Sequence, residues 1–191
     1  MPRFVRFLLL PIGLVVALAG AALAAQVPSL PRIEQHGRWL LDDQGRIVML
    51  RGGNLHLPGD GGPDGRPDAE TPRKLADKGF NGVRLVLFFD RLMPEPGKVD
   101  AAYLDEIARA VAGYREAGVY VLLDVHQDEY GPAVGVRGMP AWATFADGHE
   151  PKRQPFPAGY FSDPAIHAAF DNFWRNKAVP GTGKGVQGLY I

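Results

Sequence analysis

Short, strongly apolar runs alternate along this chain with longer segments whose apolar residues recur every three or four positions. Two of the runs, residues 82–89 (GVRLVLFF) and residues 119–125 (VYVLLDV), are apolar on both faces. Runs of this kind are typical of strands in a parallel sheet, which is covered on both sides. We therefore predict two buried parallel strands, the second of which leads directly into a group of ionisable residues.

A weaker pair of runs, residues 39–41 and residues 46–50, comes earlier in the chain. It flanks residues 42–45 (DDQG), which are turn formers. This arrangement predicts a short β-hairpin whose second strand ends at residues 51–54.

The one-sided segments predict helices. The first is expected to begin at Thr71 as N-cap, with Pro72 at the first helical position, and to end near Gly79. Asp100 is expected to cap the second helix, and Gly118 closes it. The second helix carries an apolar stripe formed by Tyr103, Leu104, Ile107, Ala108, Val111 and Tyr114.

A third helix is predicted from Ala165 to Lys177, with Ser162 or Asp163 as its cap. A long loop rich in glycine and proline precedes it, and residues 180–185 form a further loop.

The order of these elements predicts an α/β fold. Strand, helix, strand, helix, strand, loop and helix require a parallel sheet with right-handed crossovers. The predicted strands start near residues 47, 83 and 119, and this regular spacing favours a (β/α)8 TIM barrel over a doubly wound sheet. Eight such units need roughly 250 residues. The 191 residues less the first 24 leave 167, so we expect only about the first three βα units of a barrel domain in residues 25–191.

The first 24 residues have the pattern of a secretory signal peptide. Arg3 and Arg6 precede an uncharged stretch that ends in Ala22-Leu23-Ala24, a small-x-small cleavage pattern. We predict removal of residues 1–24 and a secreted or periplasmic protein; an uncleaved membrane anchor is the alternative.

Composition excludes some classes of partner. The chain has 21 basic and 21 acidic residues, and no basic patch favours nucleic acid. It has no cysteine, so no disulfide and no lipid attached through cysteine are expected.

The strand predicted at residues 119–125 contains Asp124 near its end, and His126 and Asp128 follow directly. Side chains two positions apart share a face of a strand, so these three are expected to point the same way. Acids and a histidine at the carboxyl end of a parallel strand are typical of an α/β active site. Their use as metal ligands is an alternative, as is catalysis by the neighbouring pair Asp128 and Glu129, although neighbours on an extended chain point apart.

Five segments of the chain resemble glycoside hydrolase family 5, in its endoglycoceramidase-related branch. The similarity covers roughly residues 33–191. The segments are residues 51–54 (RGGN), 81–84 (NGVR), 123–128 (LDVHQD), 139–144 (MPAWAT) and 169–174 (AFDNFW).

The resemblance implies a retaining β-glycosidase that acts on glycolipid-like or other β-glycosides, without a metal or organic cofactor. It implies no nucleic-acid partner, and membrane contact only through the signal segment or a lipid-linked substrate. His126, Asp128 and Trp142 are the expected substrate-binding residues. The resemblance also implies three residues that position the site without touching the substrate: Asn54, Arg84 and Asp124. Arg84 is expected either to pair with Asp124 or to hold the nucleophile of a complete barrel in place.

The chain departs from the family pattern in two places. The family's acid/base is the Glu of an Asn-Glu-Pro segment at strand four and its nucleophile is a Glu at strand seven, yet this sequence has no Asn-Glu pair. Retaining hydrolysis needs both carboxyl groups. We therefore expect no catalytic residue in this chain and no hydrolysis by it. Residues 55–58 (LHLP) also replace a lysine-bearing stretch of some endoglycoceramidases.

Two non-enzymatic functions are alternatives: a carbohydrate-binding half-barrel, and a membrane-tethered chain. Several aromatic residues bear on this choice. Phe88 and Phe89 are candidates for a sugar platform or a lipid-facing groove, whereas Trp174 is expected in the core.

Overall fold

The computed structural model describes residues 30–57, residue 60 and residues 68–190. The predicted signal peptide therefore lies outside the described residues, as does most of the loop expected at residues 58–67. Within the described part, no helix is long and apolar enough to cross a membrane.

Two sheets form the strand framework. Strands β1 (Glu34–His36) and β2 (Trp39–Leu41) pair antiparallel. Strands β3 (Gly52–His56), β4 (Gly82–Phe88) and β5 (Tyr120–His126) form a parallel sheet in the order β3-β4-β5. The predicted α/β fold with parallel strands is confirmed.

The predicted hairpin is confirmed only in part. Residues 46–48 do turn back onto β2, with an antiparallel bridge between Ile47 and Leu41 and a bond from the Val48 amide to the Leu40 carbonyl at 2.8 Å, but they form no full strand, and the partner strand of β2 is β1. The Asn81 side chain explains why residues 49–51 join no strand. Its amide nitrogen donates to the Met49 carbonyl at 3.0 Å, and its oxygen accepts from the Arg51 amide at 2.7 Å.

As a result the parallel strands start at Gly52, Gly82 and Tyr120, and the predicted equal spacing is not observed. The start of β3 also requires a glycine. A Cβ at Gly52 would lie 1.5 Å from the Gly82 carbonyl oxygen, so the first two strands approach closely only because residue 52 has no side chain.

The three predicted helices are present. They are α1 (Thr71–Asp77), α3 (Ala101–Glu116) and α5 (Pro164–Trp174). Asp100 caps α3 by accepting from the Tyr103 amide at 3.0 Å, and Asp163 caps α5 by accepting from the Ala165 amide at 2.9 Å. Helix α5 ends before the predicted Lys177. The sequence missed the short elements α2 (Phe89–Leu92), η2 (Ala141–Ala143), α4 (Gly159–Ser162) and α6 (Gln187–Tyr190).

The N-cap of α1 is a correction. Glu70, rather than Thr71, occupies the cap position and makes no side-chain cap bond. Thr71 is instead the first residue of the helix, and its hydroxyl is engaged with Asp68. It donates to the Asp68 carboxylate at 2.9 Å and accepts from the Asp68 amide at 2.9 Å.

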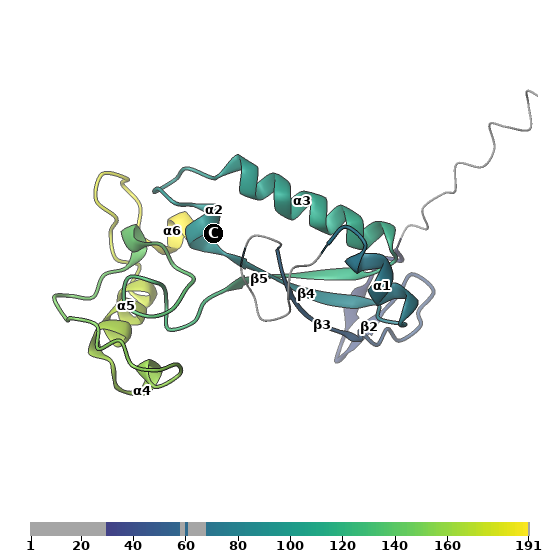
Figure 1. The fold of residues 1–191 in the computed structure, drawn as a ribbon, viewed down its shortest axis with the longest axis horizontal. Coiled ribbons are helices and arrows are strands. Elements are labelled where there is room, and N and C mark those ends of the chain that lie inside the picture. The colour runs from purple at the N-terminus through teal and green to yellow at the C-terminus, as the bar shows by residue number, and fades with distance from the viewer. Residues whose placement is uncertain (1–29, 58–59, 61–67, 191) are drawn as a thin grey trace, which may run out of the picture.

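Helix α3 runs along one face of the parallel sheet (Figure 1). Alternate β4 residues Val83, Leu85 and Leu87 meet the helix there, in a core that includes Tyr103 and Ile107. The opposite face of β4 carries Arg84, Val86 and Phe88. Arg84 therefore lies on the face opposite α3, together with the buried apolar side chains of Val86 and Phe88.

Helix α3 buries a narrower stripe than predicted. Tyr103, Ile107 and Tyr114 are buried, whereas Leu104 is 48% exposed and Ala108 is also exposed. Leu104 and Ala108 are each one residue beyond the buried positions, and about 100° of rotation per residue turns them away from the sheet.

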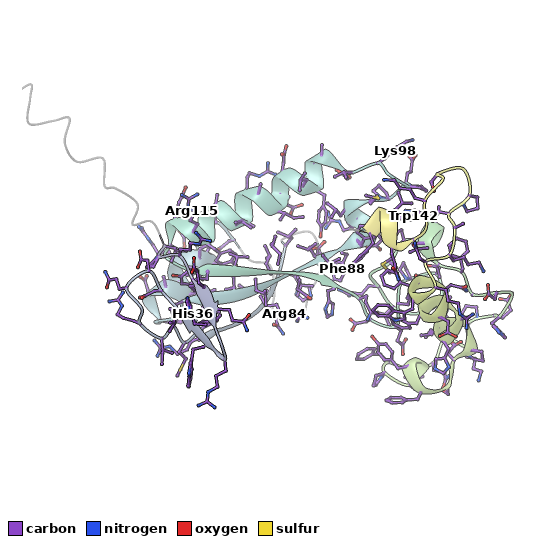
Figure 2. The ribbon with its side chains drawn as sticks, turned by 180° about the vertical axis from the view of Figure 1, so that it is seen from behind. His36, Arg84, Phe88, Lys98, Arg115 and Trp142 are labelled. Atoms are coloured by element: carbon purple, nitrogen blue, oxygen red, sulfur yellow. The ribbon has the colours of Figure 1, made fainter. Side chains whose placement is uncertain are left out.

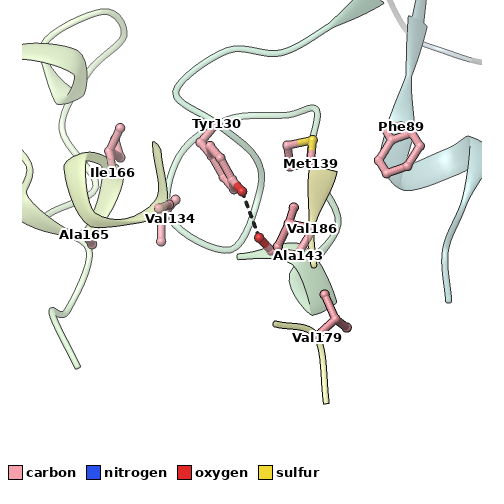
Figure 3. Packing of buried hydrophobic residues seen from close by; sticks show 10 residues of the cluster. Phe89, Tyr130, Val134, Met139, Ala143, Ala165, Ile166, Val179 and Val186 are labelled. Atoms are coloured by element: carbon pink, nitrogen blue, oxygen red, sulfur yellow. Dashed lines mark hydrogen bonds between the residues drawn. The ribbon is translucent and has the colours of Figure 1, made fainter. Parts of the chain in front are cut away.

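The chain beyond β5 forms a separate cluster, here called the carboxyl-terminal lobe (residues 127–190). Its core contains Tyr130, Met139, Ala143, Ile166 and Val186, with Phe89 of α2 packed against it. Figure 3 shows the Tyr130 hydroxyl donating to the Ala143 carbonyl, at 2.8 Å. This bond ties the loop after β5 to η2.

Trp174 is a correction, because it is 73% exposed rather than in the core. It is the last residue of α5. The buried face of the helix lies around Ile166 and Ala169, whereas the Trp174 ring lies outside that face and meets the Phe173 ring in a T-shaped contact, with centroids 5.3 Å apart.

Strand β5 is an edge strand with apolar side chains exposed on both faces. Leu122, Leu123 and Val125 are 64%, 52% and 40% exposed. An exposed apolar edge is a template for association with another chain. We predict that residues 25–191 expressed alone associate, and that L123K with V125K shifts them toward monomer. Size-exclusion chromatography with light scattering measures this.

The matched control for that experiment is L104K, since Leu104 is comparably exposed but lies on α3. It should leave association unchanged. A wild-type monomer with a sharp thermal transition would refute the prediction.

Candidate functional site

The polar residues of the sheet gather on the face opposite α3. The registers Asn54↔Arg84↔Leu122 and Phe88↔His126 align side chains of one face across β3, β4 and β5. Figure 2 shows Arg84 midway along the sheet, Phe88 nearer its carboxyl end, and Trp142 in the lobe beyond. Because the strands are parallel, their carboxyl ends meet at one edge, and the candidate site lies there.

Four charged or ionisable side chains form a chain of contacts on this face. Arg84 Nη2 lies 2.7 Å from Asp124 Oδ2. His126 Nδ1 lies 2.9 Å from the same oxygen, and His126 Nε2 lies 3.3 Å from Asp128 Oδ2. The predicted grouping of Asp124, His126 and Asp128 is thus observed, and each imidazole nitrogen faces a carboxylate.

Arg84 has the ion pair that a charged residue inside an apolar strand requires. Its side chain is 36% exposed and that of Asp124 is 20% exposed, so water screens part of the attraction. Asp124 Oδ2 is buried, and no described donor is aligned with it as a hydrogen bond despite the short distances. Arg84 and Asp124 form an ion pair, and Arg84 Nη2 also lies within hydrogen-bond distance of His126 Nδ1, at 3.3 Å. Arg84 and Asp124 thus both orient the imidazole of His126.

His126 and Asp128 are accessible to a ligand, with side chains 25% and 27% exposed. A carboxylate accepts hydrogen bonds from hydroxyl groups, and an imidazole both donates and accepts. This pair therefore suits a sugar, which offers many hydroxyls. Its role in binding stays a prediction.

The two other predicted residues lie at different places. Asn54 is exposed on β3, opposite Arg84 in the strand register. Trp142 is part-buried in the carboxyl-terminal lobe; its Nε1 donates to the Met93 carbonyl at 2.9 Å, and its ring meets the edge of Phe89. Trp142 is thus held by the lobe core rather than by the His126 group. Its contact with substrate stays a prediction.

Phe88 and Phe89 are not a platform for sugar. They are 4% and 3% exposed, which contradicts the alternative that they form an open aromatic surface. Instead Phe88 has neighbours that sequence reasoning missed. His56 stacks on its ring at 6.2 Å, His126 meets its edge at 6.1 Å, and the Arg137 guanidinium lies 4.9 Å from its centroid.

Glu129 is structural. It is only 3% exposed, its Oε1 accepts from the Gly159 amide at 2.9 Å, and its own amide donates to the Tyr160 hydroxyl at 2.8 Å. Its carboxylate is therefore occupied at the start of α4, which argues against Asp128 and Glu129 as a catalytic pair.

Three polar side chains, Asp60, Arg91 and Tyr103, here called the polar clasp, meet at the carboxyl end of β4. The Asp60 carboxylate, whose side chain is 0% exposed, pairs with Arg91 and accepts from the Tyr103 hydroxyl at 3.0 Å. The same hydroxyl accepts from the Phe88 amide at 3.1 Å. Burial raises the pKa of Tyr103 far above the ordinary phenol value, so the hydroxyl keeps its proton. The clasp links the loop after β3 to the carboxyl end of β4.

A hollow of about 420 Å³ lies at the opposite end of the sheet, lined by Gly52, Gly82, Arg84 and Tyr120. It includes neither His126 nor Asp128. We assign the site to the carboxyl ends of the strands, because that is where the ionisable groups converge. Among the described residues no group of three or more histidines and acids has the arrangement of a metal site.

The class of this protein follows from its match to one protein family. The model of the cellulase family (glycosyl hydrolase family 5) matches residues 41–179. The chain belongs to this family, whose members hydrolyse glycosidic bonds, and its parallel βα units match part of their barrel.

Several of the related proteins are named endoglycoceramidases. Endoglycoceramidase I of Rhodococcus hoagii (strain 103S) is 38% identical over 149 residues, which cover 75% of this chain and 30% of that protein. An endoglycoceramidase of Cyanea nozakii is 26% identical, over 89% of this chain and 39% of that protein. The chain thus spans well under half the length of these relatives.

Two solved structures support the same relationship. An endogalactoceramidase superposes with a TM-score of 0.70 at 32% identity, over 84% of this chain and 38% of that one. Endo-glycoceramidase II from Rhodococcus sp., solved as its lactosyl-enzyme intermediate, gives a TM-score of 0.61 at 39% identity, over 72% and 34%.

Proposed function

We propose that this chain forms the sugar-binding first part of a retaining β-glycosidase that acts on glycolipid-like β-glycosides. The observation that carries the proposal is the position of His126 between Asp124 and Asp128 at the carboxyl end of β5, in a chain of glycosyl hydrolase family 5. Similarity to proteins solved with a lactosyl group and with ganglioside GM3 supports a glycolipid substrate.

We further propose that these residues bind the glycone but do not cleave it. Retaining hydrolysis uses two carboxyl groups about 5–5.5 Å apart on either side of the glycosidic bond. Asp124 is paired with Arg84, Glu129 is buried against Gly159, and Asp128 lies against His126. The acid/base and the nucleophile then have to come from other parts of a family barrel.

The expected result for residues 25–191 is therefore no release of product from a fluorogenic β-lactoside or from a fluorescent glycosylceramide. The assay compares residues 25–191 with the complete gene product. In our proposal the complete gene product binds lactose. Turnover by residues 25–191 that disappears in D128N would contradict the division into binding and catalytic parts.

We also propose that the protein is exported, because residues 1–24 have the pattern of a secretory signal peptide. Amino-terminal sequencing of the secreted protein tests it, and a first residue at or near Ala25 is expected.

A further inference from the structure

Backbone hydrogen bonds hold Arg137 beside the candidate site. The loop after β5 folds back so that the Asp128 amide donates to the Arg137 carbonyl at 2.9 Å and the Arg137 amide donates to the Asp128 carbonyl at 3.2 Å. The next carbonyl, that of Gly138, accepts from the Asp90 amide at 2.8 Å. Arg137 is therefore held between the ends of β4 and β5.

The backbone next to Arg137 requires a glycine at residue 138. Its φ is +126°, and a Cβ there would lie 2.3 Å from the Cβ of Gln127. No side chain fits, so the backbone conformation that presents Arg137 depends on a glycine.

The Arg137 guanidinium is half-buried over the Phe88 ring, 4.9 Å from its centroid. It forms no ion pair and no side-chain hydrogen bond with any described residue. Arg84 and Arg153 differ from it, because Arg84 pairs with Asp124 and Arg153 donates to the carbonyls of a neighbouring loop. A partly desolvated cation without an anion is unfavourable, and a ligand anion would offset that cost.

The chemistry of the site divides between Arg137 and Asp128. Asp128 accepts hydrogen bonds and so suits sugar hydroxyls, whereas a guanidinium only donates, and its planar fork fits a carboxylate with two parallel bonds. Asp124 faces Arg84 and Asp128 faces His126, so neither carboxylate forms an ion pair with Arg137.

We propose that Arg137 is a specificity-determining residue that binds the carboxylate of an acidic sugar unit in the substrate. The proposal rests on the function proposed above, since it concerns the same sugar-binding edge of the sheet. It adds the charge of the glycan that this edge selects.

The test measures binding of matched neutral and acidic probes to the complete gene product by isothermal titration calorimetry. The pairs are lactose with 3′-sialyllactose, and methyl β-glucoside with methyl β-glucuronide. We expect the acid of at least one pair to bind roughly five- to tenfold more tightly, with a preference that weakens as salt is added. In R137Q the preference should vanish while the neutral sugar binds as before.

Two further variants make the result specific. R137K keeps the charge without the planar fork and should retain only part of the preference. R109Q is the matched control, since Arg109 is exposed on α3, and it should behave as wild type.

The outcomes separate the two proposals. Neutral binding without any acid preference, or a preference that survives in R137Q, overturns the role of Arg137 alone. An equal loss of neutral and acidic binding in R137Q also overturns it, because Arg137 would then only support the loop. If neither neutral nor acidic sugars bind, the proposed function falls as well.

Discussion

Replacing His126 with alanine is expected to weaken lactose binding by at least about tenfold, which corresponds to roughly 1.4 kcal/mol. His126 joins Asp124 to Asp128 through its two ring nitrogens, at 2.9 Å and 3.3 Å. Without the imidazole, the site loses one group that can form a hydrogen bond with the sugar. Asp128 also loses the side chain that holds its carboxylate in position. Titration calorimetry on the complete gene product measures the change.

H149A is the control for this prediction, because His149 is an exposed histidine of the carboxyl-terminal lobe. Its effect on lactose binding should be negligible. H126Q, which can still form hydrogen bonds, should bind between wild type and H126A. Equal lactose affinity in H126A and wild type would remove His126 from the site.

Replacing Leu85 with alanine is expected to lower the free energy of unfolding by about 2–5 kcal/mol. Leu85 is 1% exposed at the middle of the central strand and belongs to the core that includes Tyr103 and Ile107 of α3. Truncation leaves a cavity between the sheet and the helix that neither element can close. Urea unfolding of the complete gene product, followed by circular dichroism, gives the change in the transition that includes the sheet.

The matched control is L104A, since Leu104 has the same chemistry but is 48% exposed on α3. Its effect should stay within about 0.5 kcal/mol. Similar losses for L85A and L104A would mean that the assignment of buried and exposed faces of α3 and β4 is wrong.

The sequence pattern alone predicted the three longest helices of the described residues, α1, α3 and α5, and the two apolar strands β4 and β5. The two-residue alternation placed Asp124 and His126 on one face of β5, and the alternation holds for any extended strand whatever it packs against. The caps Asp100 and Asp163 were equally local, because a cap acts within three residues of itself. The family resemblance also depended only on short segments, and the family assignment is confirmed.

The errors arose where distant residues decide the local structure. The Asn81 side chain, some thirty positions away, holds residues 49–51 out of a strand. Trp174 and Leu104 have the composition of core residues, yet whether each is buried depends on which element lies beside it.

The site shows the same division between local pattern and tertiary structure. The sequence by itself identified Arg84, inside one apolar strand, and Asp124, His126 and Asp128, at the end of another, as candidates. Charged residues in such places are unusual and need a reason. The sequence offered the pair of Arg84 with Asp124 as one of two alternatives, and the β4–β5 register brings the two residues together. Only the tertiary structure showed that Arg137 lies over Phe88, which depends on how the loop after β5 folds back. The physical reason is range: backbone geometry repeats every two or four residues, whereas an ion pair or a ring contact needs two distant segments brought together by the whole core.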